Sequence, residues 1–251
     1  MIDFVKHVEW EYYWYFQPSK KIQLSSFEKL NSSSWAKNYK REIKTKIEVL
    51  ENIPIDSEIE PSKEQIETLN YIIGNQDKII SSIYDYHNDF LYPMFSKWTD
   101  IEEEDIINSL SELGRVYGIE YVRIPTTEKR SGYFLIHFDF RYDDEHGLYI
   151  LFKDGHPIDS YALGDENFDA IYIYENELKN KNGEPLVFSL RDVDESAILR
   201  GSSFADEKID FLLKKGTYRI YVTCNEHNYS MYFCAKNDLE GFTLNQITRM
   251  Q

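Results

Sequence analysis

Several features that would mark a secreted or membrane protein are missing from this sequence. It has only two cysteines, Cys224 and Cys234, which are too few for a disulfide framework. It has no run of about 18 apolar residues, and its first seven residues lack the basic and then apolar order of a signal peptide. We therefore expect a cytoplasmic protein with no membrane partner.

Positive charge is scarce as well. The chain has 28 Lys and Arg against 44 Asp and Glu, which gives a net charge of −16. Residues 1–60 carry nine basic and ten acidic side chains, so residues 61–251 carry −15 of this total. A field of this sign repels phosphate backbones and anionic lipids and attracts basic proteins. We therefore expect no direct nucleic-acid partner.

Common catalytic signatures are absent too. The sequence contains no Gly-x-Ser-x-Gly, no glycine-rich phosphate loop, no Cys-x-x-Cys and no His-Glu-x-x-His. We therefore expect a protein that is not an enzyme and that needs no cofactor or metal.

What the chain does contain is material for a large core. Hydrophobic residues make up 42% of it and aromatic residues 16%. We predict an α+β fold, mainly antiparallel β-sheet and sandwich-like, with one long amphipathic helix and one shorter helix. Its 251 residues fit two modules, 1–165 as an α+β domain and 166–251 as a C-terminal β-rich module or an extension of the first sheet.

The N-terminal part favours strands. Residues 8–16 are dense in aromatic and β-branched side chains, so we expect a strand there and a second strand near residues 22–27. Residues 39–50 fit either a strand or a helix. Residues 51–61 hold two prolines and several acids, which indicates a linker.

Two helices are expected after this linker. Ser62-Lys63-Glu64-Gln65 fits a capping box, and apolar residues then recur at spacings of three and four. This pattern predicts a helix over 62–92 that ends at Pro93. A second helix is expected over 100–113, because its apolar residues share one face and the acids at 102–105 suit the positive end of a helix dipole.

From residue 117 the apolar period changes to two, which predicts a β-meander over 117–163. Tyr133–Tyr142 alternates, with phenylalanines on the face that we assign to the core. We place one turn at Asp143–Gly147, before a strand at 148–152. Asp154-Gly155 is a strong hairpin signal before a last strand at 156–163.

The C-terminal part is expected to add further strands. We place them at 170–174, 186–190 and 211–213, followed by a hairpin of 217–224 with 229–235. A four-residue loop in this hairpin would pair Cys224 with Tyr229 and set Cys234 opposite Arg219. The two thiols would then not face each other.

The densest group of polar side chains is Asp143-Asp144-Glu145-His146, with His137 and Asp139 on the strand before it. Three interpretations are open. The group forms a turn with Asx-type hydrogen bonds and a positive φ at Gly147, and also serves as a recognition surface. It belongs to a calcium-binding β-sandwich module. Or His137, Asp139 and Glu145 form part of an enzyme site built from distant positions.

Two segments carry a family resemblance. Ile59-Glu60-Pro61-Ser62-Lys63-Glu64-Gln65-Ile66, together with Phe138 to Leu148, resembles an uncharacterised bacterial domain family over residues 5–165. In that family a Pro-Ser/Thr-x-Glu-Gln helix start precedes a Trp-Asp-x-Glu-His-Gly turn, and this chain has Tyr142 in place of Trp. The resemblance implies an immunity protein of a polymorphic toxin system. The segment Phe211 to Ile220 is also similar to part of a competence-associated nuclease inhibitor.

Our leading hypothesis is an acidic binding protein that neutralises a basic toxin or nuclease. Acidic side chains would steer the association, and tyrosines would anchor it. The residues expected at the contact are Asp143, Asp144, Glu145, His146, Tyr149 and Tyr161.

Overall fold

The computed structural model describes residues 2–10, 13–33, 35, 45–50, 60–126, 131–161, 169–175, 178, 180, 183–192, 194 and 196–247. The chain divides into two compact units. Unit 1 comprises Met1–His87, Thr99–Pro157 and Tyr161–Asp165, and unit 2 comprises Asn88–Trp98, Ile158–Ser160 and Glu166–Gln251. The fold is α+β with mostly antiparallel sheets, as expected from the sequence. Among the described helices, none is long and apolar enough to span a membrane.

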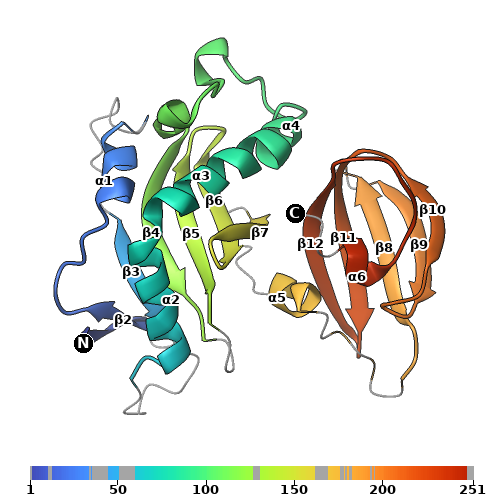
Figure 1. Cartoon of the computed structure of the whole chain (residues 1–251), viewed down its shortest axis with the longest axis horizontal. Coiled ribbons are helices and arrows are strands. Elements are labelled where there is room, and N and C mark those ends of the chain that lie inside the picture. Colours follow the sequence, from blue (N-terminus) through green and yellow to red (C-terminus); the bar gives the residue numbers. More distant parts are fainter. Residues whose placement is uncertain are drawn as a thin grey trace. The chain divides into compact units, whose positions relative to one another are not determined.

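Unit 1 is built on a seven-stranded sheet whose strands lie in sequence order, β1 to β7 (Figure 1). Its strands are β1 (Phe4–Trp10), β2 (Tyr13–Pro18), β3 (Lys46–Leu50), β4 (Tyr117–Ile124), β5 (Tyr133–Phe140), β6 (Asp143–Lys153) and β7 (His156–Tyr161). β3 and β4 pair in parallel, whereas β4 and β6 each pair antiparallel with β5. Strands β4 to β7 lie side by side in sequence order, as the predicted meander requires, and both residues of the predicted Asp154-Gly155 turn have positive φ. Residues 162–163 of the predicted last strand lie outside the described part of the chain.

The N-terminal predictions are only partly correct. The single strand expected at 8–16 is a hairpin of β1 and β2. The strand expected near 22–27 is wrong, because Ser25–Ser32 forms helix α1 and buries Phe27 and Leu30. Residues 46–50 are strand β3; residues 39–44 and 51–59 lie outside the described part of the chain.

The long helix expected over 62–92 is a series of shorter helices. α2 (Lys63–Gly74) begins at the predicted capping box, in which Ser62 and Gln65 bond each other's backbone N–H. A break at Asn75 leads to α3 (Gln76–Tyr86), then to the π-helical η2 (His87–Leu91) and to α4 (Tyr92–Phe95). Pro93 does not end the helix, because it lies in the first turn of α4, where its missing N–H leaves no bond unmade.

Helices α2 and α3 cross one face of the sheet (Figure 1). Two hydrogen bonds attach them to the β6–β7 turn: the Tyr71 hydroxyl donates to the Asp154 carbonyl at 2.6 Å, and the Ser82 hydroxyl donates to the Gly155 carbonyl at 2.7 Å. The helix expected over 100–113 is wrong. The chain forms two short 3-10 helices there, η3 (Glu103–Asp105) and η4 (Leu110–Arg115).

Strand β5 is the centre of the unit 1 core. Its phenylalanine face is buried, as predicted, but so is its other face, and all eight residues of β5 are buried. Polar side chains on that second face, His137 and Asp139, are therefore 5% exposed each. Both side chains therefore belong to the interior of unit 1 and not to its surface.

Unit 2 contains a four-stranded antiparallel sheet with the order β12-β11-β8-β9 and a two-stranded sheet of β10 and β13 (Figure 1). Its elements are α5 (Asp169–Tyr174), β8 (Leu186–Asp192), β9 (Ala197–Ser203), β10 (Ile209–Leu213), β11 (Gly216–Cys224), β12 (His227–Ala235), β13 (Leu239–Phe242) and α6 (Leu244–Ile247). The strand expected at 170–174 is wrong, because these residues form α5, which packs against β12.

The β11–β12 hairpin is tighter than expected. Asn225 and Glu226 both adopt positive φ, +49° and +70°, so a two-residue turn pairs Cys224 with His227 and Cys234 with Thr217. The predicted four-residue loop is wrong. The two cysteines are nonetheless apart and free, as expected.

Candidate functional site

The turn expected at Asp143–Gly147 lies two residues earlier in the chain. Phe140 pairs directly with Asp143, so the hairpin turns at Arg141 and Tyr142. Between this pair and the next one, Phe138 with Leu148, a single residue of β5 faces four residues of β6. Residues Asp143–Gly147 therefore form a wide bulge at the start of β6, which we call the acidic bulge.

The acidic bulge is closed by its own polar groups. The Asp143 Oδ1 atom accepts a hydrogen bond from the His146 backbone N–H at 3.1 Å and lies 2.9 Å from the His146 Nδ1 atom. The hydrogen bond and the negative charge of Asp143 raise the pKa of His146. Gly147 has a φ of +71°. The predicted Asx-type bonding and positive φ are therefore confirmed, although the bulge has replaced the turn.

Beneath the bulge lies His137, whose ring sits between two tyrosines. The ring centres of Tyr121 and Tyr149 are 4.5 Å and 4.4 Å from that of His137. The His137 Nδ1 atom is 3.0 Å from the Glu120 carboxylate, but the two groups are not aligned as a hydrogen bond. The contact between His137 and Glu120 is therefore one of packing.

A buried ion pair between β3 and β4 lies beside the rings of Tyr121 and Tyr149. Arg123 on β4 faces Glu48 on β3, with 2.8 Å between the Arg123 Nε atom and the carboxylate. Their side chains are 13% and 6% exposed. The Tyr149 hydroxyl lies 3.4 Å from Arg123 and 3.0 Å from the Tyr121 hydroxyl. Contacts among these side chains and the His137 ring thus connect β3, β4, β5 and β6 in the interior.

The residues expected at a contact surface separate into two sets. Asp144, Glu145 and His146 are exposed, and Asp143 is partly exposed. Tyr149 and Tyr161 are 0% and 7% exposed, so both rings belong to the interior and neither is presented to a partner. For the enzyme alternative, Glu145 is exposed whereas His137 and Asp139 are buried, so the three residues do not share one environment.

A second acidic segment, residues 102–105, contacts the turn between β5 and β6. Arg141 in the turn pairs with Asp105, with 3.1 Å between the Arg141 Nε and Asp105 Oδ2 atoms. The Tyr142 hydroxyl donates to the Asp105 carbonyl at 2.9 Å. The Arg141 guanidinium also lies 5.6 Å from the centre of the Trp35 ring. The turn therefore holds residues 102–105 beside the acidic bulge.

We call the combined surface the acidic corner; it consists of Glu102, Glu103, Glu104, Asp105, Asp143, Asp144 and Glu145. Glu102, Glu103 and Glu104 are exposed. Sequence reasoning missed this surface because it assigned residues 102–105 to a helix start. The two acidic runs are about 40 positions apart, and the bonds of Asp105 to the hairpin bring them together.

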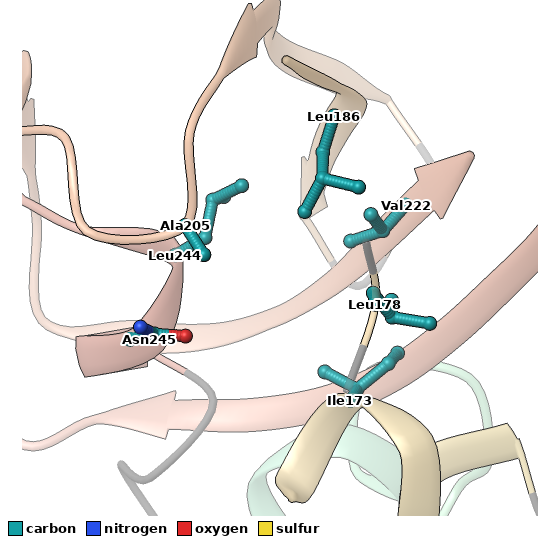
Figure 2. Close-up of a pocket in the computed structure, with 7 residues that line it drawn as sticks. All are labelled: Ile173, Leu178, Leu186, Ala205, Val222, Leu244 and Asn245. Carbon is teal, nitrogen blue, oxygen red and sulfur yellow. The ribbon is translucent and has the colours of Figure 1, made fainter. Parts of the chain in front are cut away.

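The described residues contain no cluster that could ligate a metal, and unit 2 contains a small cavity. No three or more His, Cys, Asp or Glu side chains of the described residues could hold a metal ion together. A shallow apolar cavity in unit 2 has a free volume of about 20 Å³ and is lined by Ile173, Leu178, Leu186, Ala205, Val222, Leu244 and Asn245 (Figure 2). This volume suits about one water molecule, well below the size of a typical ligand pocket.

Comparison with known proteins places the N-terminal part of the chain in a family. No curated protein and no solved structure matches the chain. A family model described as "Domain of unknown function (DUF6985)" matches residues 26–165. This match spans 140 of the 251 residues, more than half of the sequence, and the chain therefore belongs to the DUF6985 family of unknown function.

Proposed function

We propose that this protein is a non-enzymatic binding protein that neutralises a basic protein partner, as an immunity or inhibitor protein of a cationic toxin or nuclease would. The observation that carries this proposal is the acidic corner. Two acidic segments that are distant in sequence are held on either side of one hairpin turn by the bonds from Arg141 and Tyr142 to Asp105.

The charge of the acidic corner suits a basic partner. Its seven carboxylates and the guanidinium of Arg141, which pairs with Asp105, together carry a formal charge of −6 when His146 is neutral. Opposite charge on two surfaces raises the rate of encounter and favours one orientation of docking. A surface of this sign also discourages nucleic acid, so a nuclease would be bound as a protein and not through its substrate.

The acidic corner is also held in one conformation by bonds among its own residues and to the hairpin turn. The acidic bulge is closed by Asp143 and His146, and the segment with Asp105 is held by two side chains of the turn. Groups that are ordered before binding lose less conformational entropy when the complex forms. Trp35, partly exposed beside Arg141, is an aromatic anchor that can take the role first given to Tyr149 and Tyr161.

The partner to test is a secreted protein with a basic toxin domain that is encoded beside the gene for this chain. The double variant Asp144→Lys/Glu145→Lys reverses two exposed charges of the corner. Asp210→Lys/Glu240→Lys makes the same change of charge at two exposed residues of unit 2 and is the matched control. Association rates with the purified toxin domain are measured by stopped flow at several salt concentrations.

We expect the corner variant to associate about tenfold more slowly at low salt, and the control to change much less. The wild-type rate should fall as salt rises. Co-expression should protect cells from the toxin with the wild type and the control, and less with the corner variant. A gene neighbourhood made up of metabolic enzymes, or equal rates for both variants, would count against the proposal.

A further inference from the structure

The two edge strands of the four-stranded sheet in unit 2 differ in how they are covered. Strand β12, at one edge, packs against α5, and the backbone N–H of Tyr232 on β12 donates to the Asp159 carboxylate at 3.2 Å. Strand β9, at the other edge, packs extensively against β8 alone among the described elements. Four of its seven residues are exposed: Ala197, Arg200, Gly201 and Ser202. The β9 edge is therefore accessible to a further strand.

The strand register shows which backbone groups of β9 point away from the sheet. Successive residues of a strand in an antiparallel sheet direct their N–H and C=O groups to opposite sides. On β8 the Asp192 N–H donates to the Ser196 carbonyl at 3.1 Å, so every second residue of β8, counted from Asp192, is directed toward β9. Gly201 pairs with one of these residues and is directed back toward β8. Its neighbours Arg200 and Ser202 therefore direct their backbone groups outward, at the spacing that another polypeptide strand matches.

Strand β9 also lacks the residues that commonly prevent pairing at a sheet edge. Lysine and proline protect many edge strands, and β9 has neither. Its register against β8 shifts at Ile198, which has no partner there, and is then regular from Leu199 to Ser203. Five consecutive residues of this edge therefore keep the geometry that a further strand requires.

The side chains of β9 favour particular residues on an incoming strand. Gly201 lies against the ring of Phe188, because a β-carbon on Gly201 would be 3.3 Å from two carbons of that ring. An apolar side chain opposite Gly201 covers the glycine and extends the packing around Phe188. Arg200 carries the only charge on β9, and its side chain lies on the other face of the sheet. An acidic side chain opposite Arg200 is therefore favoured.

We propose that the β9 edge binds an extended segment of another protein, which adds a fifth strand to this sheet. The segment alternates apolar with polar residues and carries an acidic residue opposite Arg200. Asp194 precedes β9 and Asp206 follows it, so acids at the two ends of the segment are disfavoured. This surface belongs to unit 2 and shares no residue with the acidic corner, so the inference does not depend on the proposed function.

A second copy of this chain fits the β9 edge less well than a different protein does. Strand β9 contains no Asp or Glu, so a second β9 would place no opposite charge beside Arg200. Each chain also has a net charge of −16, and two such chains repel each other. The charges therefore favour a partner that has its own acidic strand residue within a less acidic chain.

Fluorescence anisotropy with the full chain and three labelled peptides of ten residues tests the proposal. The first peptide alternates phenylalanine or valine with threonine and has one glutamate at its centre. The second has lysine in place of this glutamate. The third is the first with its central backbone nitrogens methylated, which removes the donors that would bond to β9.

Two variants change the β9 edge, and each has a matched control. Ser202→Pro removes an outward N–H and leaves the bonds to β8 in place, whereas Ser202→Thr keeps that N–H. Arg200→Glu reverses the charge of the edge, and Lys215→Glu makes the same change at an exposed lysine of unit 2 outside β9. Circular dichroism checks that each variant is folded, and Arg200→Glu and the methylated peptide retain the test if Ser202→Pro unfolds.

We expect saturable binding of the glutamate peptide, weakened about tenfold by Ser202→Pro or by methylation of the peptide and little by Ser202→Thr. Arg200→Glu should weaken this peptide several-fold and strengthen binding of the lysine peptide, and Lys215→Glu should change both much less. Absence of binding, or equal weakening by the two Ser202 variants, would overturn the proposal. A wild-type dimer in sedimentation velocity that Ser202→Pro dissociates would also overturn it, because a second copy would then occupy the edge.

Discussion

A β-carbon on Gly147 would lie 2.8 Å from the Nε2 atom of His137. It would also lie 2.6 Å from the backbone carbonyl oxygen of Phe138, which cannot move away as a side chain can. The acidic bulge thus passes directly over the buried histidine, and only glycine permits this approach. Gly147 thus lets the backbone that carries the exposed acids lie directly against the interior of the sheet.

Replacing Gly147 with alanine should therefore lower the free energy of unfolding by about 3 kcal/mol. The positive φ contributes about 1–2 kcal/mol of this cost, and the forced shift of neighbouring atoms contributes the remainder. Gly183→Ala is the control, because Gly183 has a similar φ of +69° but nothing within 4 Å of the added carbon. Urea denaturation should give a loss of about 1 kcal/mol for the control, and equal losses would show that the contact with His137 is unimportant.

The bulge also shows how far the sequence could predict this region. Asp143, His146 and Gly147 carry local turn chemistry, and their predicted Asx-type bonding and positive φ are present. The same chemistry suits a bulge as well as a turn, because both need a bent backbone and a glycine. Which of the two forms depends on the register of β5 against β6, which pairs Phe138 with Leu148 as well as Phe140 with Asp143. The alternation of residues along one strand does not give this register.

The errors in secondary structure have a similar cause. Apolar residues at 106, 107, 110 and 113 fit a helix, but the chain forms two short 3-10 helices there, and Asp105 at the end of the first one pairs with Arg141 of the hairpin. Residues 171–174 are β-branched and aromatic, yet they form part of α5 because the segment packs against β12. The capping box at Ser62 was predictable because its bonds are all local. The secondary structure of the other two segments depends on contacts with residues distant in the sequence.

Tyr142 offers a second test, because its hydroxyl holds the Asp105 carbonyl while its ring packs near His87 and Phe140. Tyr142→Phe should lower the free energy of unfolding by about 1 kcal/mol, since a partly buried carbonyl loses its donor. Amide exchange should also become faster over Glu103–Asp105. Tyr84→Phe removes a comparable bond to the Asn108 carbonyl at an exposed site and should cost less. Unchanged exchange in Tyr142→Phe would show that the corner is held by other contacts.

The pH dependence of stability should reflect His87. Its side chain is 1% exposed, its Nδ1 atom lies 2.9 Å from the Tyr117 hydroxyl, and burial lowers its pKa to about 4 from an ordinary value of 6.5. Between these two values the unfolded chain binds a proton that the folded chain does not. The contribution of His87 to the free energy of unfolding is therefore fully present above pH 6.5. It falls by about 3 kcal/mol as the pH decreases toward 4.

Urea denaturation between pH 7 and pH 4 measures this loss. His87→Gln should flatten the profile, because glutamine does not titrate, although its stability at pH 7 is expected to be lower. His156→Gln, a change at an exposed histidine, is the control and should leave the slope as it is in the wild type. A profile of the same slope in His87→Gln would assign the acid sensitivity to other groups.

The ion pair of Arg123 and Glu48 allows a comparison between the effect of a buried ion pair on stability and that of an exposed one. Both charges are almost fully removed from water, so truncating one leaves the other buried without its partner. Glu48→Ala should lower the free energy of unfolding by about 3–5 kcal/mol. Glu67→Ala breaks an exposed pair with Lys63 and should cost less than about 0.5 kcal/mol.

The double variant Glu48→Leu/Arg123→Met tests whether the pair is needed for stability at all. Two apolar side chains of similar volume remove both desolvation costs, so this variant should be more stable than Glu48→Ala by several kcal/mol and close to the wild type. The Tyr149 hydroxyl would keep its contact with Tyr121. If the double variant is as unstable as Glu48→Ala, the charges themselves hold β3 against β4, and the interior of this sheet requires its ionic character.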